Sequence, residues 1–238
     1  MTGIRLITLD LDDTLWEVAP VIVRAEQTLQ DWLNREHPAW LQHVGHDGLA
    51  SLRREIAAQH PQHRHDLSRM RLLLLEELLR RSAHPEHDVP RAAQAAFEVF
   101  LTARNQVTLF DGVEQVLAEL SRDYRVHALS NGNADVHRVG LGRYFHEHFS
   151  AARAGQAKPH PRMFEMALEA AGVGPEQAVH VGDHPEQDVL AARAVGMRTV
   201  WVNATGSPWT GEATPDAVIR SVRELPVVLR RLQDLTPP

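Results

Sequence analysis

One strand-like segment opens this chain, and the next lies beyond residue 120. Residues Ile4–Leu9 are mostly apolar and β-compatible and run into acidic residues, which is the pattern of a buried central strand ending in a polar loop. From residue 108 onward, predicted strands alternate with predicted helices, as in a parallel sheet covered on both faces. The sequence therefore predicts a Rossmann-like, doubly wound α/β core from residues 1–16 and 108–238, with residues 17–107 inserted as an α-helical cap domain.

The spacing of apolar residues also predicts the individual elements. In the inserted segment we expect helices after Pro20, over 40–60 with an interruption near Gly45 and Gly48, over 66–82, and over 90–104. In the core we expect strands at 125–129, 148–152, 178–181, 198–202 and 216–219. Core helices are expected at 112–122, 161–171, 186–195 and 222–232.

Composition excludes several classes of function. The 238 residues include no cysteine, which rules out disulfides, thiolate nucleophiles, cysteine-ligated zinc and iron–sulfur clusters. The net charge of −6 argues against a nucleic-acid binder, which normally has a basic face. No apolar run exceeds four residues and the N-terminus does not resemble a signal peptide, so we expect no membrane span and a cytoplasmic protein.

Polar side chains gather where the predicted strands end, which is where doubly wound sheets bind ligands. Three strand ends supply the residues Asp10, Asp12, Asp13, Thr14, Ser130, Asn131, Gly132, Asn133 and Asp183, with Asp188 just beyond. Each acid alone is more typical of a helix cap or turn, but together they form a charge cluster. Carboxylates that lie so close together repel one another unless a cation lies among them, and oxygen-only ligands suit Mg²⁺.

Lys158 is the only lysine among 25 basic residues, the other 24 being arginine. Chance survival of one lysine is the alternative to a functional role, but an ammonium group is a compact point charge that guanidinium cannot replace. A carboxylate of the cluster can act as a nucleophile that forms an aspartyl-phosphate, and a second can act as general acid and base. Mg²⁺, the lysine and a hydroxyl would stabilise the transferring phosphoryl group.

Four segments resemble the motifs of the haloacid dehalogenase (HAD) superfamily. LITLDLDDTLW, VHALSN, GQAKP and VHVGDHPEQDVLAARAVGM match them in order and together span residues 4–197. The resemblance implies that Asp10 is the nucleophile, Asp12 the acid/base, Ser130 a ligand of a phosphoryl oxygen and Lys158 the charge-balancing lysine. It also implies that Mg²⁺ is held by Asp10, the backbone carbonyl of Asp12 and Asp183, with Asp188 supporting the site.

The same resemblance narrows the reaction. Dehalogenases proper lack the second aspartate of the first motif, whereas this chain has Asp12, so a phosphatase acting on a small phosphorylated metabolite is implied. The strings DLDDTLW, HDLSRMR, SNGNA, GLGRYF and HVGD resemble bacterial FMN and riboflavin-precursor phosphatases. A phosphosugar mutase remains open, because the same residues could return the phosphoryl group to a sugar.

Several further residues are candidates for substrate binding. Arg69 and Arg71 could meet an anionic substrate or lie on a solvated helix face, and Trp16 could stack on a substrate ring or pack at the cap hinge. Asn131 and Asn133 could donate amide hydrogen bonds to substrate or cap the next helix, and Gly132 is a further candidate for substrate binding. The histidines at 60, 63 and 65 are expected to form a solvated loop rather than a metal site.

Two non-enzymatic readings compete with the phosphatase. A phospho-accepting signalling module also combines acids, a hydroxyl and a lysine around Mg²⁺, but an insertion of about 90 helical residues does not suit a compact receiver domain. A catalytically inactive protein of the same fold that only binds a partner would lack motif residues, and none is missing. We expect a monomer or a homodimer. The run Leu72–Leu75 is expected to lie in the core of the cap or between cap and core, with a dimer contact as the alternative.

Overall fold

The computed structural model describes residues 3–234 of the chain, apart from the side chains of residues 42, 43 and 45–47. It divides into two compact units: Met1–Val18 together with Val107–Pro238, called here the α/β unit, and Ala19–Gln106, called the helical unit. These limits differ by one or two residues from the domain boundaries expected from sequence. Among the described residues no helix is long and apolar enough to cross a membrane.

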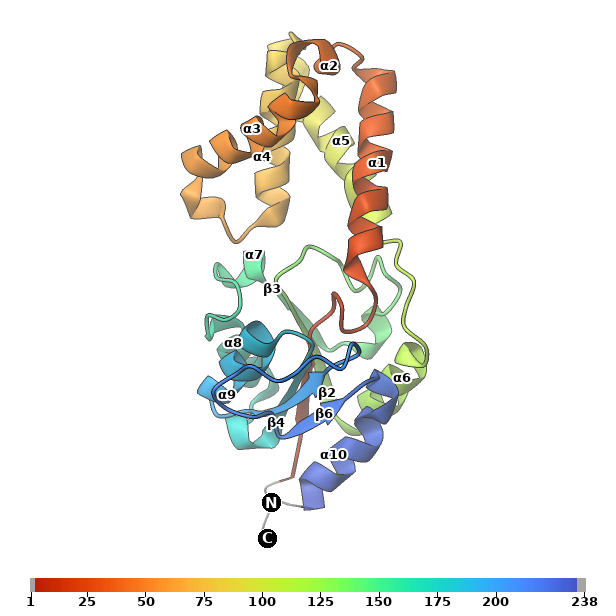
Figure 1. The fold of residues 1–238 in the computed structure, drawn as a ribbon, viewed down its shortest axis with the longest axis vertical. Helices are drawn as coiled ribbons and strands as arrows, with labels where there is room; N and C mark the ends of the chain where they lie inside the picture. The colour runs from red at the N-terminus through yellow and green to blue at the C-terminus, as the bar shows by residue number, and fades with distance from the viewer. Residues whose placement is uncertain (1–2, 235–238) are drawn as a thin grey trace. The chain divides into compact units, whose positions relative to one another are not determined.

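A six-stranded parallel sheet forms the centre of the α/β unit (Figure 1). Its strands are β1 (Leu6–Leu9), β2 (Arg125–Ser130), β3 (Glu147–Ser150), β4 (Ala178–Gly182), β5 (Arg198–Val202) and β6 (Ala217–Ile219). Their order is β3-β2-β1-β4-β5-β6, so the chain reverses direction across the sheet at β1, as in doubly wound folds. The predicted Rossmann-like α/β core is confirmed.

Helices cover both faces of this sheet (Figure 1). On one side lie α6 (Val113–Asp123) and α10 (Leu225–Asp234), and on the other α8 (Arg162–Ala171) and α9 (Ala191–Ala194); a short α7 (Ala151–Ala154) follows β3. Met163, Phe164 and Ala167 of α8 pack in one buried cluster with Leu6 of β1. Because both faces are covered, β1 reads as four fully buried residues rather than as an alternating pattern.

One predicted helix of the α/β unit has a different form. Residues 186–195 were expected to be a single α-helix, but Pro185–Leu190 form a π-helical segment that leads into α9. His184 caps this segment, because its Nδ1 accepts from the backbone N–H groups of Glu186 and Gln187. A π-helical turn is rare and is found mostly at functional sites, and this one carries Asp188.

The helical unit consists of α1 (Val18–Glu36, which begins in the α/β unit), α2 (Trp40–His43), α3 (Gly45–Gln59), α4 (Leu67–Arg81) and α5 (Val89–Arg104). Asp66 caps α4 by accepting a hydrogen bond from the backbone of Arg69 at 2.8 Å. The expected interruption near Gly45 is confirmed, because α2 ends at His43 and α3 begins at Gly45, whereas α3 runs through Gly48 without a break. A Cβ at position 48 would lie 3.2 Å from Cγ1 of Val44, so glycine there allows close packing rather than ending a helix.

The run Leu72–Leu75 contributes to the core of the helical unit. Leu74 and Leu75 are buried together with Leu78 and Leu79, while Leu72 and Leu73 are partly buried against the same cluster. Packing within the helical unit therefore accounts for Leu72–Leu75, as expected for residues of the cap core.

The same helix offers a matched test of that core. Leu78 is 1% exposed and Leu67 is 50% exposed, both in α4. Leu78→Ala should lower the free energy of unfolding by about 2–5 kcal/mol, because a buried cavity is left, whereas Leu67→Ala should change it by less than about 0.5 kcal/mol. Urea unfolding of both variants measures this, and equal losses would show that α4 does not bury the face described.

Candidate active site

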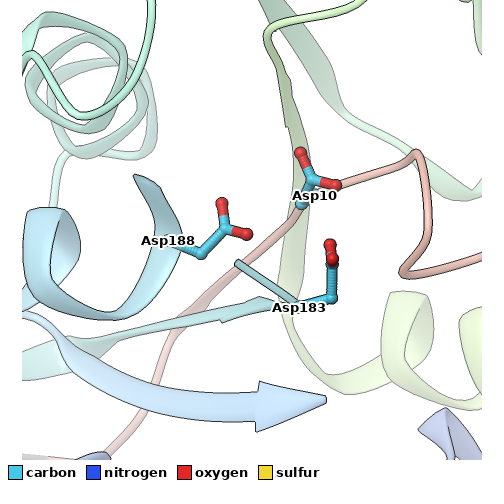
Figure 2. Close-up of side chains that lie close together, drawn as sticks. All are labelled: Asp10, Asp183 and Asp188. Atoms are coloured by element: carbon cyan, nitrogen blue, oxygen red, sulfur yellow. The ribbon is translucent and has the colours of Figure 1, made fainter. Parts of the chain in front are cut away.

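Three carboxylates converge at the carboxyl edge of the sheet (Figure 2). Asp10 directly follows β1, Asp183 directly follows β4, and Asp188 projects from the π-helical segment. One oxygen of each lies within 4.8 Å of the others, and among the described residues this is the one group of acids or histidines arranged to hold a metal ion. The backbone N–H of Asp10 donates to the carbonyl of Val181 at 2.9 Å, which ties the end of β1 to β4.

Lys158 joins this cluster from the loop before α8. Its Nζ donates to Oδ1 of Asp10 at 2.6 Å, to Oδ1 of Asp188 at 2.5 Å and to the carbonyl of Leu129 at 2.9 Å. The side chain is buried, and its three ammonium hydrogens match three acceptors. The one lysine of the sequence therefore lies between two of the predicted site residues.

Asn131 holds the lysine loop in place. Its Oδ1 accepts from the backbone N–H of Lys158 at 2.7 Å, and its Nδ2 donates to the carbonyl of the same residue at 2.9 Å and to Gln187 at 2.8 Å. Both amide hydrogens are thus engaged within the protein. This arrangement favours a positioning role over the substrate contact that we expected for Asn131.

Burial and charge act in opposite directions on these groups. Burial raises the pKa of Asp10 well above its usual value, although Lys158 lowers it in part, and burial together with Asp188 raises the pKa of Asp183 to about 6. Burial alone would also raise the pKa of Asp188, but Lys158 and His180 outweigh it and lower that pKa. Burial alone would lower the pKa of Lys158, but Asp10 and Asp188 raise it. The ionised form of Asp188 is therefore favoured, while ionisation of Asp10 and Asp183 is disfavoured.

Asp188 is surrounded by donors. Besides Lys158, the Nε2 of His180 contacts its Oδ1 at 3.1 Å, and the backbone N–H of His184 donates to its Oδ2 at 2.9 Å. Gly182 makes this approach possible, because a Cβ there would lie 2.3 Å from the carboxyl carbon of Asp188. The burial of His180 lowers its pKa, so the ring is neutral. Sequence reasoning did not single out His180; a histidine within an apolar strand was the signal.

The loop after β1 fixes the second predicted catalytic carboxylate. Oδ1 of Asp12 accepts from the indole N–H of Trp16 at 2.8 Å, and Thr14 Oγ1 donates to Asp183 at 3.1 Å. Trp16 is fully buried. Of the two roles considered for Trp16, its burial favours packing over stacking on a substrate. Its indole N–H also orients the carboxylate of Asp12.

A small polar cavity of about 160 Å³ lies over the cluster. Asp10, Asp12, Ser130, Gly132 and Asp183 are among the residues that line it. The backbone N–H of Gly132 donates to Ser130 Oγ at 2.9 Å, which leaves the hydroxyl hydrogen of Ser130 to donate elsewhere. Residues of three of the four sequence motifs thus line one space, and Lys158 of the remaining motif contacts Asp10 and Asp188 beside it.

The two arginines of the helical unit differ in their surroundings. Arg71 pairs with Glu26 at 2.8 Å and lies over the ring of Phe100, 3.5 Å from its centre, so its guanidinium is held within the unit. Arg69 is more exposed, and its nearest ion-pair contact is Glu76 at 3.9 Å. Substrate binding by either residue remains a prediction, and this environment makes Arg69 the better candidate.

The chain matches the family model of haloacid dehalogenase-like hydrolases over residues 4–196. It is 31% identical to the 5-amino-6-(5-phospho-D-ribitylamino)uracil phosphatase YigB of Escherichia coli, over 84% of this chain and 83% of that protein. It is also 31% identical to a phosphoserine phosphatase of Thermus thermophilus, over 93% of this chain and 97% of that protein. A solved structure described as a 2-haloacid dehalogenase from Pseudomonas syringae pv. tomato superposes with a TM-score of 0.90 at 39% identity, covering 96% and 99% of the two chains.

The chain therefore belongs to the haloacid dehalogenase-like hydrolases, as the four motifs implied. It is an enzyme of the hydrolase class built on the α/β core described above.

The raised pKa of Asp183 predicts a distinctive pH dependence of stability. Between its usual value of 3.8 and about 6, the folded protein keeps a proton that the unfolded chain releases, so the free energy of unfolding should fall as pH rises through this range. Metal-free Asp183→Asn should show a smaller fall, because only the contribution of Asp10 remains, and should exceed the wild type at pH 7 by on the order of 1 kcal/mol, a value reduced to allow for partial exposure.

Urea unfolding at pH 4, 5, 6 and 7 in chelator measures the difference between the two proteins. Asp123→Asn, which removes an exposed charge at the end of α6, serves as the matched control and should keep the fall. Added Mg²⁺ should stabilise the wild type more than Asp183→Asn, because a ligand that binds the folded state raises its stability. Parallel pH profiles for wild type and Asp183→Asn would contradict the prediction.

Proposed function

We propose that this hydrolase is a Mg²⁺-dependent phosphatase that cleaves a small phosphate monoester through an aspartyl-phosphate on Asp10. The observation that carries the proposal is the contact of Lys158 with both Asp10 and Asp188 beside Asp183, under a cavity that Ser130 also lines. At the level of class, the chain is a phosphoric monoester hydrolase, in keeping with its family and its phosphatase relatives.

The donor set fits a divalent cation. Three carboxylates with oxygens within 4.8 Å and raised pKa values at Asp10 and Asp183 describe a cluster that lacks positive charge, and all its ligand atoms are oxygen, which suits Mg²⁺. Asp10 and Asp183 would hold the ion, with the backbone carbonyl of Asp12, and Asp188 would support them. When bound, Mg²⁺ would neutralise charge on the phosphoryl group.

The residues of the chain divide the chemistry among them. An ionised Asp10 attacks phosphorus while Lys158 and the hydroxyl of Ser130 meet the phosphoryl oxygens. Asp12, oriented by the indole of Trp16, gives a proton to the leaving oxygen. The same carboxylate then takes a proton from the water that attacks the aspartyl-phosphate, and inorganic phosphate leaves.

Asp12 is also what favours a phosphatase over a dehalogenase. The structural relative from Pseudomonas syringae is described as a dehalogenase, and the fold alone does not separate the two reactions. Dehalogenases proper are expected to lack the second aspartate of the first motif, and this chain has Asp12 beside the cavity. A mutase would use the same residues, with a sugar hydroxyl in place of water.

For the substrate, we propose the phosphate of a ribitylaminouracil or FMN. The relative YigB is named for the former, and the strings HDLSRMR and SNGNA resemble that branch. Phosphoserine is the competing substrate, because the Thermus thermophilus relative is equally identical over more of the chain. A metabolite substrate also agrees with the cytoplasmic location expected from the sequence.

Trapping the intermediate tests the mechanism. Asp12→Asn should accumulate phosphoenzyme, because loss of the general base slows water attack by on the order of 10²–10⁴-fold, whereas Asp10→Asn should gain no phosphoryl group. Intact-protein mass spectrometry after acid quenching measures the added mass. Asp123→Asn, at an exposed position that does not line the cavity, is the matched control, and its turnover should persist.

Chelator should prevent labelling of Asp12→Asn, and Mg²⁺ should restore it. Labelled Asp10→Asn would show that another residue is the nucleophile. Full labelling in excess chelator would refute the metal requirement while leaving the nucleophile assigned.

A substrate panel tests specificity. The purified protein should hydrolyse FMN and the ribitylaminouracil phosphate with a higher kcat/KM than phosphoserine, sugar phosphates or nucleotides, as measured by phosphate release. The panel includes 2-chloropropionate with detection of chloride, and glucose 1-phosphate with detection of the 6-phosphate. Preference for phosphoserine would reassign the substrate alone, whereas chloride release without phosphatase activity would overturn the proposed reaction.

A further inference from the structure

A fully buried histidine links the middle of the sheet to the active site. His180 lies in β4 directly opposite Thr8 of β1, and it is 1% exposed. Its Nδ1 lies 2.8 Å from Oγ1 of Thr8, and its Nε2 lies 3.1 Å from Oδ1 of Asp188. Neither Thr8 nor His180 takes part in the chemistry proposed above. Both polar side chains are nevertheless buried, where apolar residues would cost less desolvation free energy.

The contacts fix which ring nitrogen carries the proton. Oδ1 of Asp188 accepts from Lys158, and a carboxylate oxygen only accepts, so Nε2 of His180 must donate. A neutral ring with its proton on Nε2 presents a lone pair at Nδ1, and the hydroxyl of Thr8 can donate to it. The other acceptor near that hydroxyl, the carbonyl of Val179, is farther away at 3.4 Å.

We propose that Thr8 and His180 form a positioning pair that holds Asp188, and through Asp188 the ammonium group of Lys158, in place for phosphoryl transfer to Asp10. The proposal rests on the proposed function. Removal of the imidazole donor would leave Oδ1 of Asp188 with Lys158 as its one donor. The carboxylate could then pivot about the hydrogen bond that its Oδ2 accepts from the backbone N–H of His184. Since Lys158 has three acceptors, displacement of one changes where its charge lies relative to Asp10.

The sheet supplies a matched control histidine. His127 of β2 is the register partner of Thr8 on the opposite side of β1 and is equally buried. The Nδ1 of His127 has no hydrogen-bond partner among residues 3–234. Within the same residues, His127 is not part of the acidic cluster of Asp10, Asp183 and Asp188. A purely structural role for a buried histidine in this row would therefore apply to His127 as well as to His180.

The kinetic test uses His180→Phe, His180→Gln, Thr8→Val, the double variant Thr8→Val with His180→Gln, and His127→Phe, assayed with p-nitrophenyl phosphate and Mg²⁺. His180→Phe should lower kcat about 10- to 100-fold with KM little changed, which is typical for loss of a group that orients a site residue. His180→Gln should recover most of the loss, since its amide nitrogen can replace Nε2 as the donor. His127→Phe should keep the wild-type kcat.

Thr8→Val should also lower kcat, because without the hydroxyl the lone pair at Nδ1 is buried without a donor and the ring is held at one end only. In the His180→Gln background the same substitution should have no effect, since no ring nitrogen is left for the hydroxyl to hold. An effect of Thr8→Val that persists there would overturn the proposed pair.

The lone lysine allows a second readout that needs no activity. In protein labelled with ¹⁵N-lysine, the single side-chain resonance belongs to Lys158. Its ¹⁵Nζ chemical shift should move in His180→Phe and Thr8→Val, return in His180→Gln, and stay in place in His127→Phe. If all variants lack phosphatase activity along with the wild type, this pattern still decides whether the pair positions Lys158.

Circular dichroism identifies variants that do not fold. Should His180→Phe unfold, the comparison of Thr8→Val with the double variant carries the test. Folded His180→Phe with wild-type kcat and an unmoved ¹⁵Nζ resonance would overturn the inference.

Discussion

The contact of one buried ammonium group with two buried carboxylates is the interaction on which the α/β unit depends. Nζ of Lys158 lies 2.6 Å from Asp10 and 2.5 Å from Asp188, and none of the three side chains is appreciably exposed. Removing such charges from water costs several kcal/mol for each ion, and only close geometry with further hydrogen bonds offsets that cost. The surrounding residues supply those bonds: the carbonyl of Leu129 accepts from Lys158, and the backbone of His184 and the ring of His180 meet Asp188.

This interaction also explains why three similar aspartates behave differently. Asp10 and Asp188 are buried and Asp183 is partly buried, but only Asp188 has enough donors around it to lower its pKa, while the pKa values of Asp10 and Asp183 rise. The positive charge that the cluster still lacks is therefore needed next to Asp10 and Asp183. Asp188 neutralises part of the lysine charge and orients it, so the cation-holding role falls mainly on the two residues at the strand ends.

Much of this could be predicted from the sequence, for physical reasons that differ between elements. The first strand was found because full burial on two faces favours a mostly apolar segment, and Asp10 was found because the chain must leave that strand at the ligand-binding edge. Lys158 was singled out because it is the one lysine of the sequence. The pattern of apolar residues did not reveal the π-helical segment, which carries Asp188 and its contacts with His180 and Lys158.

Side-chain roles that depend on partners distant in sequence could not be predicted in this way. For Asn131 the sequence left substrate binding and helix capping open, and the structure adds hydrogen bonds of its amide to the backbone of Lys158, 27 residues away. For Arg71 it left an anionic substrate and a solvated helix face open, and the structure adds contacts with Glu26 and Phe100. In both cases a polar side chain found a protein partner through tertiary packing, and one sequence contains no local signal for such pairs.

The size of the cavity separates chemistry from selectivity. A volume of about 160 Å³ lined by carboxylates, a serine and backbone groups suits a phosphoryl group, whereas pockets that enclose a whole drug-sized ligand measure roughly 300–1,000 Å³. The flavin or uracil ring of the proposed substrate must therefore be recognised by residues outside this cavity. The same core can then serve different esters, which agrees with equal identity to a ribitylaminouracil phosphatase and a phosphoserine phosphatase. Selectivity in such a protein rests on side chains that the reaction itself does not constrain, and for that reason the motifs predict the reaction more firmly than the substrate.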